Sequence, residues 1–154
     1  KHILFCGDLA RGRTVRSLAL LLTNYTNISM TFAAPDQLQI GNDILEQLDR
    51  AGVKYELTSN FKDAIPQADA AYMTRIQDEW DQSKGESARI DTRLYKIGAE
   101  ELKLLSPRGI IMHPLPRVNE ISVAIDDDPR AAYFRQVANG KFIRMALILK
   151  LLGL

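Results

Sequence analysis

The 154-residue sequence contains one cysteine, two histidines and one tryptophan, and neither sign of charge predominates. A single cysteine excludes a disulfide within the chain, and because Cys6 lies in an apolar run we expect a reducing, cytoplasmic compartment. So few thiols and imidazoles leave no ligand spacing typical of a metal site, and we predict neither a metal nor a cofactor. The net charge of +1 predicts no nucleic-acid surface.

Long hydrophobic runs are also missing. The apolar opening is about five residues long and stops at Gly7, which is too short for a secretory signal peptide. Arg144 and Lys150 interrupt the apolar C-terminal stretch, so we expect no membrane span. The 46% of apolar and 25% of charged residues are typical of a globular protein, and the length predicts one domain over residues 1–154.

Short apolar runs alternate along the chain with helical patterns, which predicts an α/β fold. The strands are expected near residues 2–6, 28–33, 53–57, 70–73 and 110–112. The helices between them are expected near 15–22, 42–51, 61–65 and 99–105. Right-handed crossovers then favour a three-layer, Rossmann-like parallel sheet in the order 3-2-1-4-5, with helices on both faces. Charged residues in the third strand predict that it lies at the edge of the sheet.

The helix boundaries follow from capping residues. Asn42 is expected as the N-cap of the second helix, and Gly52 is expected just after its end. Residues 126–129 are expected to start a further helix, because Pro129 suits a first turn. Residues 139–140, Asn-Gly, are expected to separate that helix from the last one. The polar stretch 78–96 predicts a long surface loop.

The last helix is expected to be apolar around most of its girth. One stripe comprises Phe142, Met145, Ala146 and Leu149, and a second comprises Ile143, Leu147, Ile148 and Leu151. A helix of this kind is normally buried on more than one face. We therefore expect the sheet to cover one stripe and a further domain to cover the other.

Three loops are expected to converge at one edge of the sheet, because strands one, four and five are neighbours in the predicted order. These loops span residues 7–14, 74–77 and 113–117. They carry Arg13 at a helix N-terminus, and Arg75 and Gln77 on one side of an extended segment. A guanidinium grips a carboxylate through two parallel hydrogen bonds, so the set predicts a site for a small dicarboxylate.

Two acidic neighbours leave a second interpretation of Arg75. Glu79 is close enough along the chain to hold the Arg75 side chain in place within such a site. Arg75 can equally pair with Asp78 or Glu79 on the surface and have no ligand at all. The spacing alone does not decide between these alternatives.

The third loop contains two prolines two residues apart, which fix an irregular and rigid backbone. The carbonyl groups of Pro114 and Leu115 can face a ligand there. We predict a cis peptide bond between Leu115 and Pro116, because such bonds are usually purposeful features of tight turns. The alternative is a purely structural turn with a buried His113.

The first loop also lies one residue from the phosphate-loop pattern, since residues 7–14 read GDLARGRT. That pattern requires lysine where this chain has Arg13, and arginine does not replace a compact ammonium between phosphates. The fourth strand also ends in Thr74-Arg75 rather than in the acidic residue that would hold magnesium. A nucleotide-binding module is therefore the less favoured alternative.

Three blocks in the chain resemble the signatures of the aspartate carbamoyltransferase family. They are GDLARGRTVRSL at 7–18, MTRIQ at 73–77 and MHPLPRVNEI at 112–121, and DPRAAYFRQVANG at 128–140 extends the match. The related ornithine enzymes carry a cysteine within the His-x-Leu-Pro motif, where this chain has Pro114. The resemblance therefore favours the C-terminal, aspartate-binding domain of the aspartate enzymes.

This resemblance implies transfer of a carbamoyl group from carbamoyl phosphate to L-aspartate, an early step of pyrimidine synthesis. It implies that Arg13 binds the α-carboxylate of aspartate and that Arg75 and Gln77 bind the β-carboxylate. The resemblance also implies that the turn formed by Pro114, Leu115 and Pro116 orients the amine through its carbonyl groups. Supporting roles are implied for Thr14, Glu79 and His113, and no residue is expected to act as a general base.

The chain departs from the family pattern in two places. Trp80 stands where the family has a basic residue in its substrate loop, so loop closure on aspartate can differ. The Ser-x-Arg-Thr-Arg motif that binds carbamoyl phosphate is missing, so the carbamoyl-phosphate domain is expected to be absent and the isolated chain inactive. The complete enzyme is expected to be a homotrimer, alone or in a larger multifunctional or regulated assembly. A catalytically silent paralogue with the same fold is the alternative.

Overall fold

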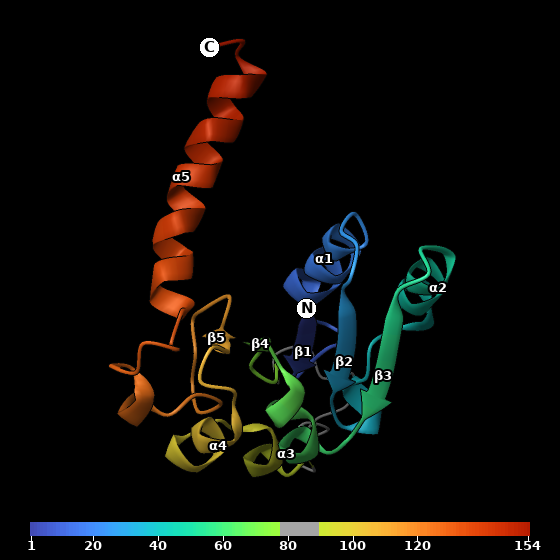
Figure 1. Cartoon of the computed structure of the whole chain (residues 1–154), viewed down its shortest axis with the longest axis vertical. Coiled ribbons are helices and arrows are strands. Elements are labelled where there is room, and N and C mark those ends of the chain that lie inside the picture. The colour runs from blue at the N-terminus through green and yellow to red at the C-terminus, as the bar shows by residue number, and fades with distance from the viewer. Residues whose placement is uncertain (78–89) are drawn as a thin grey trace.

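The computed structural model describes residues 1–77 and 90–154 of the chain (Figure 1). The strands are β1 (His2–Cys6), β2 (Ser29–Ala33), β3 (Lys54–Thr58), β4 (Ala70–Met73) and β5 (Ile110–Met112). The α-helices are α1 (Arg13–Leu22), α2 (Asn42–Arg50), α3 (Phe61–Ala64), α4 (Ala99–Leu104) and α5 (Tyr133–Leu151). Short 3-10 helices lie at Asp36–Leu38, Ile65–Gln67, Thr92–Tyr95 and Val123–Ile125.

All five strands are parallel, and their order is β3-β2-β1-β4-β5. The α/β fold, the strand order and the edge position of β3 are thereby confirmed. The register pairs Cys6 of β1 with Met73 of β4, and Tyr72 of β4 with Met112 of β5. The carboxyl ends of β1, β4 and β5 therefore lie side by side.

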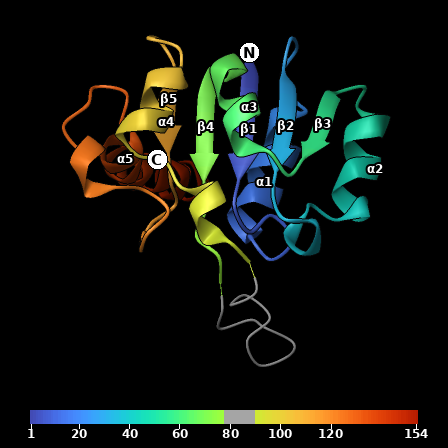
Figure 2. The ribbon, with the colours of Figure 1, turned by 90° about the horizontal axis from the view of Figure 1, so that it is seen from below.

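Alternation along the strands builds two separate hydrophobic cores. In β1, Leu4 and Cys6 belong to one core cluster, whereas Phe5 belongs to the other. Helices α1 and α2 cover the Phe5 face, since Val15 and Ile44 pack there, and α3 and α4 cover the opposite face (Figures 1 and 2). The three-layer arrangement is therefore confirmed.

The start of α2 differs from the prediction by one residue. Gly41, in an extended conformation, is the N-cap, and Asn42 is the first helical residue, with no capping hydrogen bond from a side chain. The expected role of Asn42 as N-cap was therefore wrong. The end of α2 was predicted correctly, because Gly52 follows Ala51 with a left-handed φ of 67°.

The chain from residue 126 onward also differs from the prediction. Residues 126–129 start no α-helix, and α5 begins only at Tyr133. Backbone hydrogen bonds from Ile111 N–H to Arg130 (2.7 Å) and from Ala132 N–H to Ile111 (2.8 Å) hold this segment beside β5. The carbonyl of Arg130 and the N–H of Ala132 are therefore bonded to Ile111 and are not available for the hydrogen bonds of an α-helix.

No break separates two helices at residues 139–140, because α5 runs continuously through them. Asn139 and Gly140 are each unfavourable in a helix by only about 0.7–1 kcal/mol. Once a helix is nucleated, each further residue adds a hydrogen bond, so two weak positions between strong helix formers do not end it.

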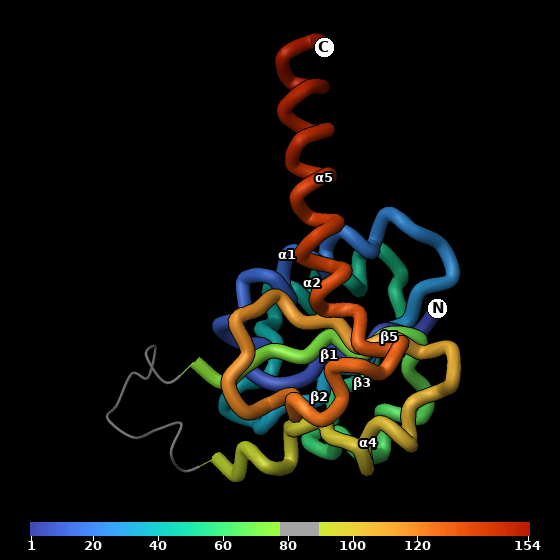
Figure 3. Tube along the Cα trace, turned by 90° about the vertical axis from the view of Figure 1, so that its left-hand side faces the viewer, coloured from blue at the N-terminus to red at the C-terminus, as the bar shows by residue number. Residues whose placement is uncertain are grey.

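Helix α5 projects away from the sheet and ends far from the body of the domain (Figures 1 and 3). Tyr133 is fully buried, but every residue from 141 onward is exposed, including Phe142 at 62% and Leu151 at 77%. The expectation that the sheet covers one apolar stripe was therefore wrong, since neither stripe is covered.

Among the described residues, no helix is long and apolar enough to cross a membrane.

The predicted loop 78–96 is described only from residue 90 onward. Its last residues are anchored rather than free at the surface. Tyr95 is buried, and its hydroxyl donates a hydrogen bond of 3.0 Å to the carbonyl of Ser59. This part of the predicted surface loop therefore packs against the α3 side of the domain.

We predict that Gly7→Ala destabilises the fold far more than Gly52→Ala. Both glycines have positive φ, but a Cβ at Gly7 would lie 2.1 Å from the carbonyl oxygen of Thr74, whereas one at Gly52 meets nothing within 4 Å. Gly52→Ala should lower the free energy of unfolding by about 1 kcal/mol, and Gly7→Ala by about 3 kcal/mol or more. Urea unfolding measures both, and equal losses would show that the close approach at Gly7 is unimportant.

Candidate functional site

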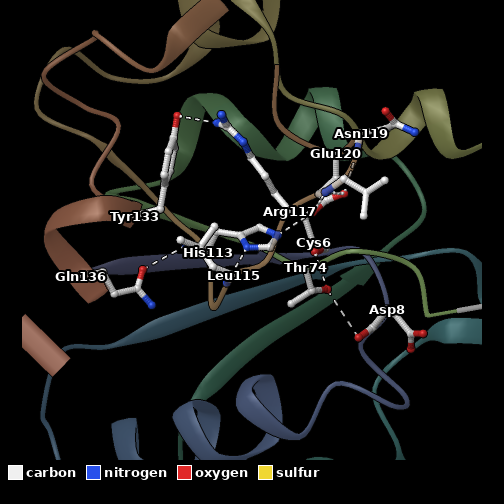
Figure 4. Close-up of polar contacts among 11 residues, drawn as sticks. Cys6, Asp8, Thr74, His113, Leu115, Arg117, Asn119, Glu120, Tyr133 and Gln136 are labelled. Carbon is white, nitrogen blue, oxygen red and sulfur yellow. Dashed lines mark hydrogen bonds and ion pairs between the residues drawn. The ribbon is translucent and has the colours of Figure 1, made fainter. Parts of the chain in front are cut away.

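The first two loops of the candidate site are joined where they leave the sheet. The N–H of Thr74 donates to the carbonyl of Cys6 at 2.8 Å, and the Thr74 hydroxyl donates to the same carbonyl at 3.1 Å (Figure 4). Thr74 is buried, so these bonds are shielded from water. The loop after β4 therefore starts in a fixed position against the loop after β1.

Asp8 holds the same two loops together one step further from the sheet. Its fully buried carboxylate accepts hydrogen bonds from Arg11 N–H (3.0 Å) and Arg11 Nε (2.7 Å) within its own loop. It also accepts a bond of 3.3 Å from the backbone N–H of Gln77. One carboxylate thereby sets the distance between the loop of Arg13 and the segment of Arg75 and Gln77.

Three backbone N–H groups of the first loop are not available to a phosphate. The N–H groups of Leu9 and Ala10 both donate to the carbonyl of Leu38 at 2.9 Å, and the N–H of Arg11 donates to Asp8. A phosphate loop needs such N–H groups to point at its anion. A buried carboxylate in the same loop repels phosphate as well, so the geometry speaks against the nucleotide-binding alternative.

Arg13 and Thr14 open helix α1, and both are exposed. Thr14 is hydrogen-bonded to the Tyr72 hydroxyl of β4; burial raises the pKa of Tyr72, and this bond partly opposes the rise. The start of α1 is thereby tied to β4. Arg13 stands at the positive end of a ten-residue helix, where its charge and the helix dipole both favour a carboxylate.

Arg75 and Gln77 lie in the extended segment after β4, and both are partly buried. The expectation that the two side chains point to the same side of this segment stays a prediction. Glu79 and Trp80 lie outside the described residues, as does the expected contact between Glu79 and Arg75. The structure thus brings Arg13, Arg75 and Gln77 to loops that start on adjacent strands.

The third loop begins at His113, next to the end of β4. The Leu115–Pro116 peptide bond is cis, as predicted, and Leu115 has a left-handed φ of 53°. His113 is 1% exposed, whereas Pro114 and Leu115 are partly buried and Pro116 is exposed. The backbone N–H of His113 donates to Oε1 of Gln136 at 3.0 Å, which ties the loop to α5.

Glu120 closes the third loop on itself (Figure 4). Nε2 of His113 lies 2.8 Å from Oε1 of Glu120, and the carboxylate accepts hydrogen bonds from the N–H groups of Val118 and Asn119. Burial by itself raises the pKa of Glu120, but the His113 ring and the backbone N–H groups of Glu120 itself and of Val118 outweigh it, and the net pKa is lowered. Glu120 is therefore a carboxylate at neutral pH.

Arg117 of the same loop forms a structural ion pair with Asp126. Its guanidinium forms two hydrogen bonds with the carboxylate of Asp126, and the Tyr133 hydroxyl donates to that carboxylate at 2.5 Å. The Arg117 guanidinium also lies over the Tyr133 and Phe134 rings, 5.4 and 5.7 Å from their centroids. The start of α5 is fixed in this way beneath the third loop.

Comparisons with known proteins decide the family. Residues 1–151 match the family model described as the aspartate/ornithine carbamoyltransferase, Asp/Orn-binding domain. The chain belongs to this carbamoyltransferase family. It is 44% identical over 149 residues to the aspartate carbamoyltransferase catalytic subunit of Clostridium kluyveri, and 44% identical over 146 residues to the chloroplastic aspartate carbamoyltransferase of rice, Oryza sativa.

Solved structures of this carbamoyltransferase family share the fold. The catalytic subunit of M. jannaschii aspartate transcarbamoylase matches 99% of the chain with a TM-score of 0.88 and 39% identity. Aspartate transcarbamoylase from Trypanosoma cruzi, solved with carbamoyl phosphate and aspartate, matches 96% with a TM-score of 0.84 and 37% identity. The chain spans about half the length of these relatives, 48% for C. kluyveri, 49% for M. jannaschii and 47% for T. cruzi.

The sequence analysis assigned no role to Asp8 or Glu120 of this carbamoyltransferase domain, and it placed Asp126 only at the start of a helix that does not form there. Each of the three carboxylates holds a loop of the candidate site through hydrogen bonds that no helical or strand periodicity in the sequence predicts. The position of Asp8 directly after Gly7 was the one available signal, because a short acidic side chain after a strand often accepts bonds from its own turn.

We predict that Asp126→Asn lowers stability in a pH-dependent way. The guanidinium of Arg117 and then the Tyr133 hydroxyl lower the pKa of Asp126 to about 2. The stabilisation is therefore fully present above the unfolded-state pKa of about 3.9 and is lost as the pH falls toward 2. Because the side chain is 27% exposed, we expect a loss of only about 1–2 kcal/mol at pH 7.

The exposed neighbour Asp127 supplies the control for this test, as Asp127→Asn. Urea unfolding between pH 7 and pH 2 should show the difference between Asp126→Asn and the unsubstituted chain shrinking below about pH 4. A difference that stays constant over this range would contradict the assignment of the ion pair.

Proposed function

We propose that this chain forms the aspartate-binding half of an aspartate carbamoyltransferase. The complete enzyme would transfer a carbamoyl group from carbamoyl phosphate to the amine of L-aspartate, giving N-carbamoyl-L-aspartate and phosphate. The observation that carries the proposal is the set of hydrogen bonds to Asp8, which joins the loop just before Arg13 to the backbone of Gln77 on a domain of this family.

The three loops offer complementary chemistry for a small amino dicarboxylate. Arg13 would bind one carboxylate, and Arg75 with Gln77 the other, each through charge-assisted hydrogen bonds. The carbonyl oxygens of Pro114 and Leu115, in the turn closed by Pro116, would accept hydrogen bonds from the amine. Thr14 and His113 would support these groups through Tyr72 and Leu115, and Glu79 is proposed to steady Arg75.

Such a site would work by positioning. A carbamoyl group and an amine held in reacting geometry gain roughly 7–11 kcal/mol relative to free reactants. We assign no general base within the described residues of this half. His113 is turned toward Leu115 and Glu120, which suits a structural role.

We further propose that the complementary half binds carbamoyl phosphate and that the complete chain acts as a homotrimer, alone or in a larger regulated assembly. The relatives are about twice as long as the matched region, and this supports the need for a second domain. We propose a cytoplasmic location, although the rice relative is named as chloroplastic.

We predict that Arg75→Ala abolishes saturation by aspartate without unfolding the protein. A charge-assisted hydrogen bond is worth roughly 1.5–3 kcal/mol, so losing one raises the KM for aspartate by roughly 10- to 150-fold. Arg75→Lys keeps the charge but not the paired geometry, and it should rescue activity only in part. Initial rates of carbamoylaspartate formation against aspartate concentration measure both variants in the native polypeptide.

An unchanged aspartate dependence in Arg75→Ala would refute the dicarboxylate assignment. A native polypeptide that binds aspartate but forms no carbamoylaspartate with carbamoyl phosphate would favour the catalytically silent paralogue. Magnesium-dependent ATP binding would instead revive the nucleotide-binding alternative.

We also predict that residues 1–154 alone are inactive and expose an apolar surface along α5. Leu147, Ile148 and Leu151 are 55%, 57% and 77% exposed, and burying all three would contribute roughly 4–9 kcal/mol. Residues 1–154 should bind a hydrophobic dye or self-associate, and adding a carbamoyl-phosphate half from a relative should suppress both and restore turnover.

Glutamine at Leu147, Ile148 and Leu151 together should remove the dye binding, whereas Val123→Gln should not, although Val123 is also exposed, at 73%. Dye fluorescence and sedimentation velocity measure the effect. A monomeric, dye-negative chain that is active without an added half would contradict both the missing-half proposal and this account of α5.

A further inference from the structure

His113 has a defined tautomer in this fold, because its two ring nitrogens face different kinds of group. The backbone N–H of Leu115 donates to Nδ1 at 2.8 Å. A nitrogen that accepts a hydrogen bond carries no hydrogen of its own, so the hydrogen of the neutral ring is on Nε2.

The other ring nitrogen faces a carboxylate. Nε2 lies 2.8 Å from Oε1 of Glu120, and the two side chains are only 1% and 10% exposed. The two atoms are close, but the angle at Nε2 is unfavourable for a hydrogen bond. Nε2 therefore has no hydrogen-bond partner within the described part of the chain. An ionised carboxylate has no hydrogen to offer, and at this distance it attracts N–H and repels a lone pair. Glu120 therefore stabilises the same tautomer that Leu115 requires.

The second oxygen of Glu120 is also needed as an acceptor. Oε2 accepts a hydrogen bond of 3.0 Å from the N–H of Asn119, and the N–H of Val118 lies 3.2 Å from both oxygens. Both oxygens of residue 120 thus face donors. Glutamine, although of the same size, would turn one NH₂ donor toward either His113 Nε2–H or Asn119 N–H.

Leu115 is the residue on which this arrangement acts. Its φ of 53° is in the left-handed region, which residues other than glycine adopt only at an energetic cost. The hydrogen bond to Nδ1 holds the Leu115 N–H in that conformation. The peptide group that contains this N–H also contains the carbonyl of Pro114, so fixing the N–H fixes that carbonyl as well.

We propose that Glu120 is a positioning residue of the aspartate site. Its carboxylate selects the Nε2–H tautomer of His113, and His113 in turn holds the carbonyl of Pro114, through the N–H of Leu115, where the amine of the substrate is proposed to bind. The inference rests on the proposed function, since it concerns the same turn. It adds a requirement that the proposed function does not contain: residue 120 must be an ionised carboxylate, and an amide of the same shape fails.

The test compares Glu120→Gln with the unsubstituted native polypeptide. We expect kcat/KM for aspartate to fall at least about tenfold, mainly through KM, because one donor is left without an acceptor. The KM for carbamoyl phosphate should stay within about twofold, since the turn is proposed to contact only the amino acid. Nitrogen-15 NMR of the histidine-labelled protein, with His113→Gln to assign the signal, reports which ring nitrogen carries the hydrogen.

Glu101→Ala is the matched control. Glu101 is also a partly buried glutamate that accepts a backbone hydrogen bond, from Gly98 at 3.1 Å, and it pairs with Lys62 at 2.9 Å on the α4 side. Its removal should lower stability but leave the KM for aspartate unchanged. The two variants therefore separate a general loss of stability from a loss of positioning.

The proposal is supported if the Nε2–H tautomer is found in the unsubstituted protein and is lost together with aspartate affinity in Glu120→Gln. It is overturned if Glu120→Gln keeps its KM for aspartate, or if the hydrogen in the unsubstituted protein is on Nδ1. The second criterion holds even if Glu120→Gln does not fold. A native polypeptide without carbamoyltransferase activity refutes the proposed function instead, and the NMR spectrum then decides the tautomer on its own.

Discussion

The buried carboxylate of Asp8 is the constraint on which the candidate site depends. An unpaired buried charge is strongly destabilising, so its three hydrogen bonds must be made together. Two come from Arg11 in its own loop and one from Gln77 in the loop after the neighbouring strand. The parallel register only places the ends of β1 and β4 side by side. Asp8 then fixes the relative position of the loops beyond those ends.

Cationic side chains in this domain divide into two groups by what they contact. Arg117 is held by Asp126, and Arg130 is held by Asp128 and by the carbonyls of Leu102 and Leu105. These guanidinium groups stabilise the third loop and the start of α5. Arg13 lies instead at an exposed helix N-terminus, where its charge is open to a ligand. Position in the fold, rather than residue type, therefore separates these structural arginines from the one proposed to bind a ligand.

The sheet could be predicted from sequence because its order follows from the alternation of apolar runs and from the hand of the crossovers. The loops bearing Arg13, Arg75 and Pro114 followed from that order. The late start of α5 could not be predicted, because residues 130–132 are held by Ile111, which is distant in sequence. The role of Glu120 could not be predicted for a similar reason, since it depends on which nitrogen of His113 faces the carboxylate.

A rotation of helix α5 about Tyr133 would move its free end much further than its first turn, which is bonded to the third loop. Gln136, which accepts the backbone hydrogen bond from His113, lies within the first turn of the helix. At about 1.5 Å per residue, the free end is roughly six times further from Tyr133 than Gln136 is. A tilt that moves the free end by about 3 Å would therefore move Gln136 by only about 0.5 Å. The far end of the helix can adjust to whatever it contacts while the loop of the site stays nearly still.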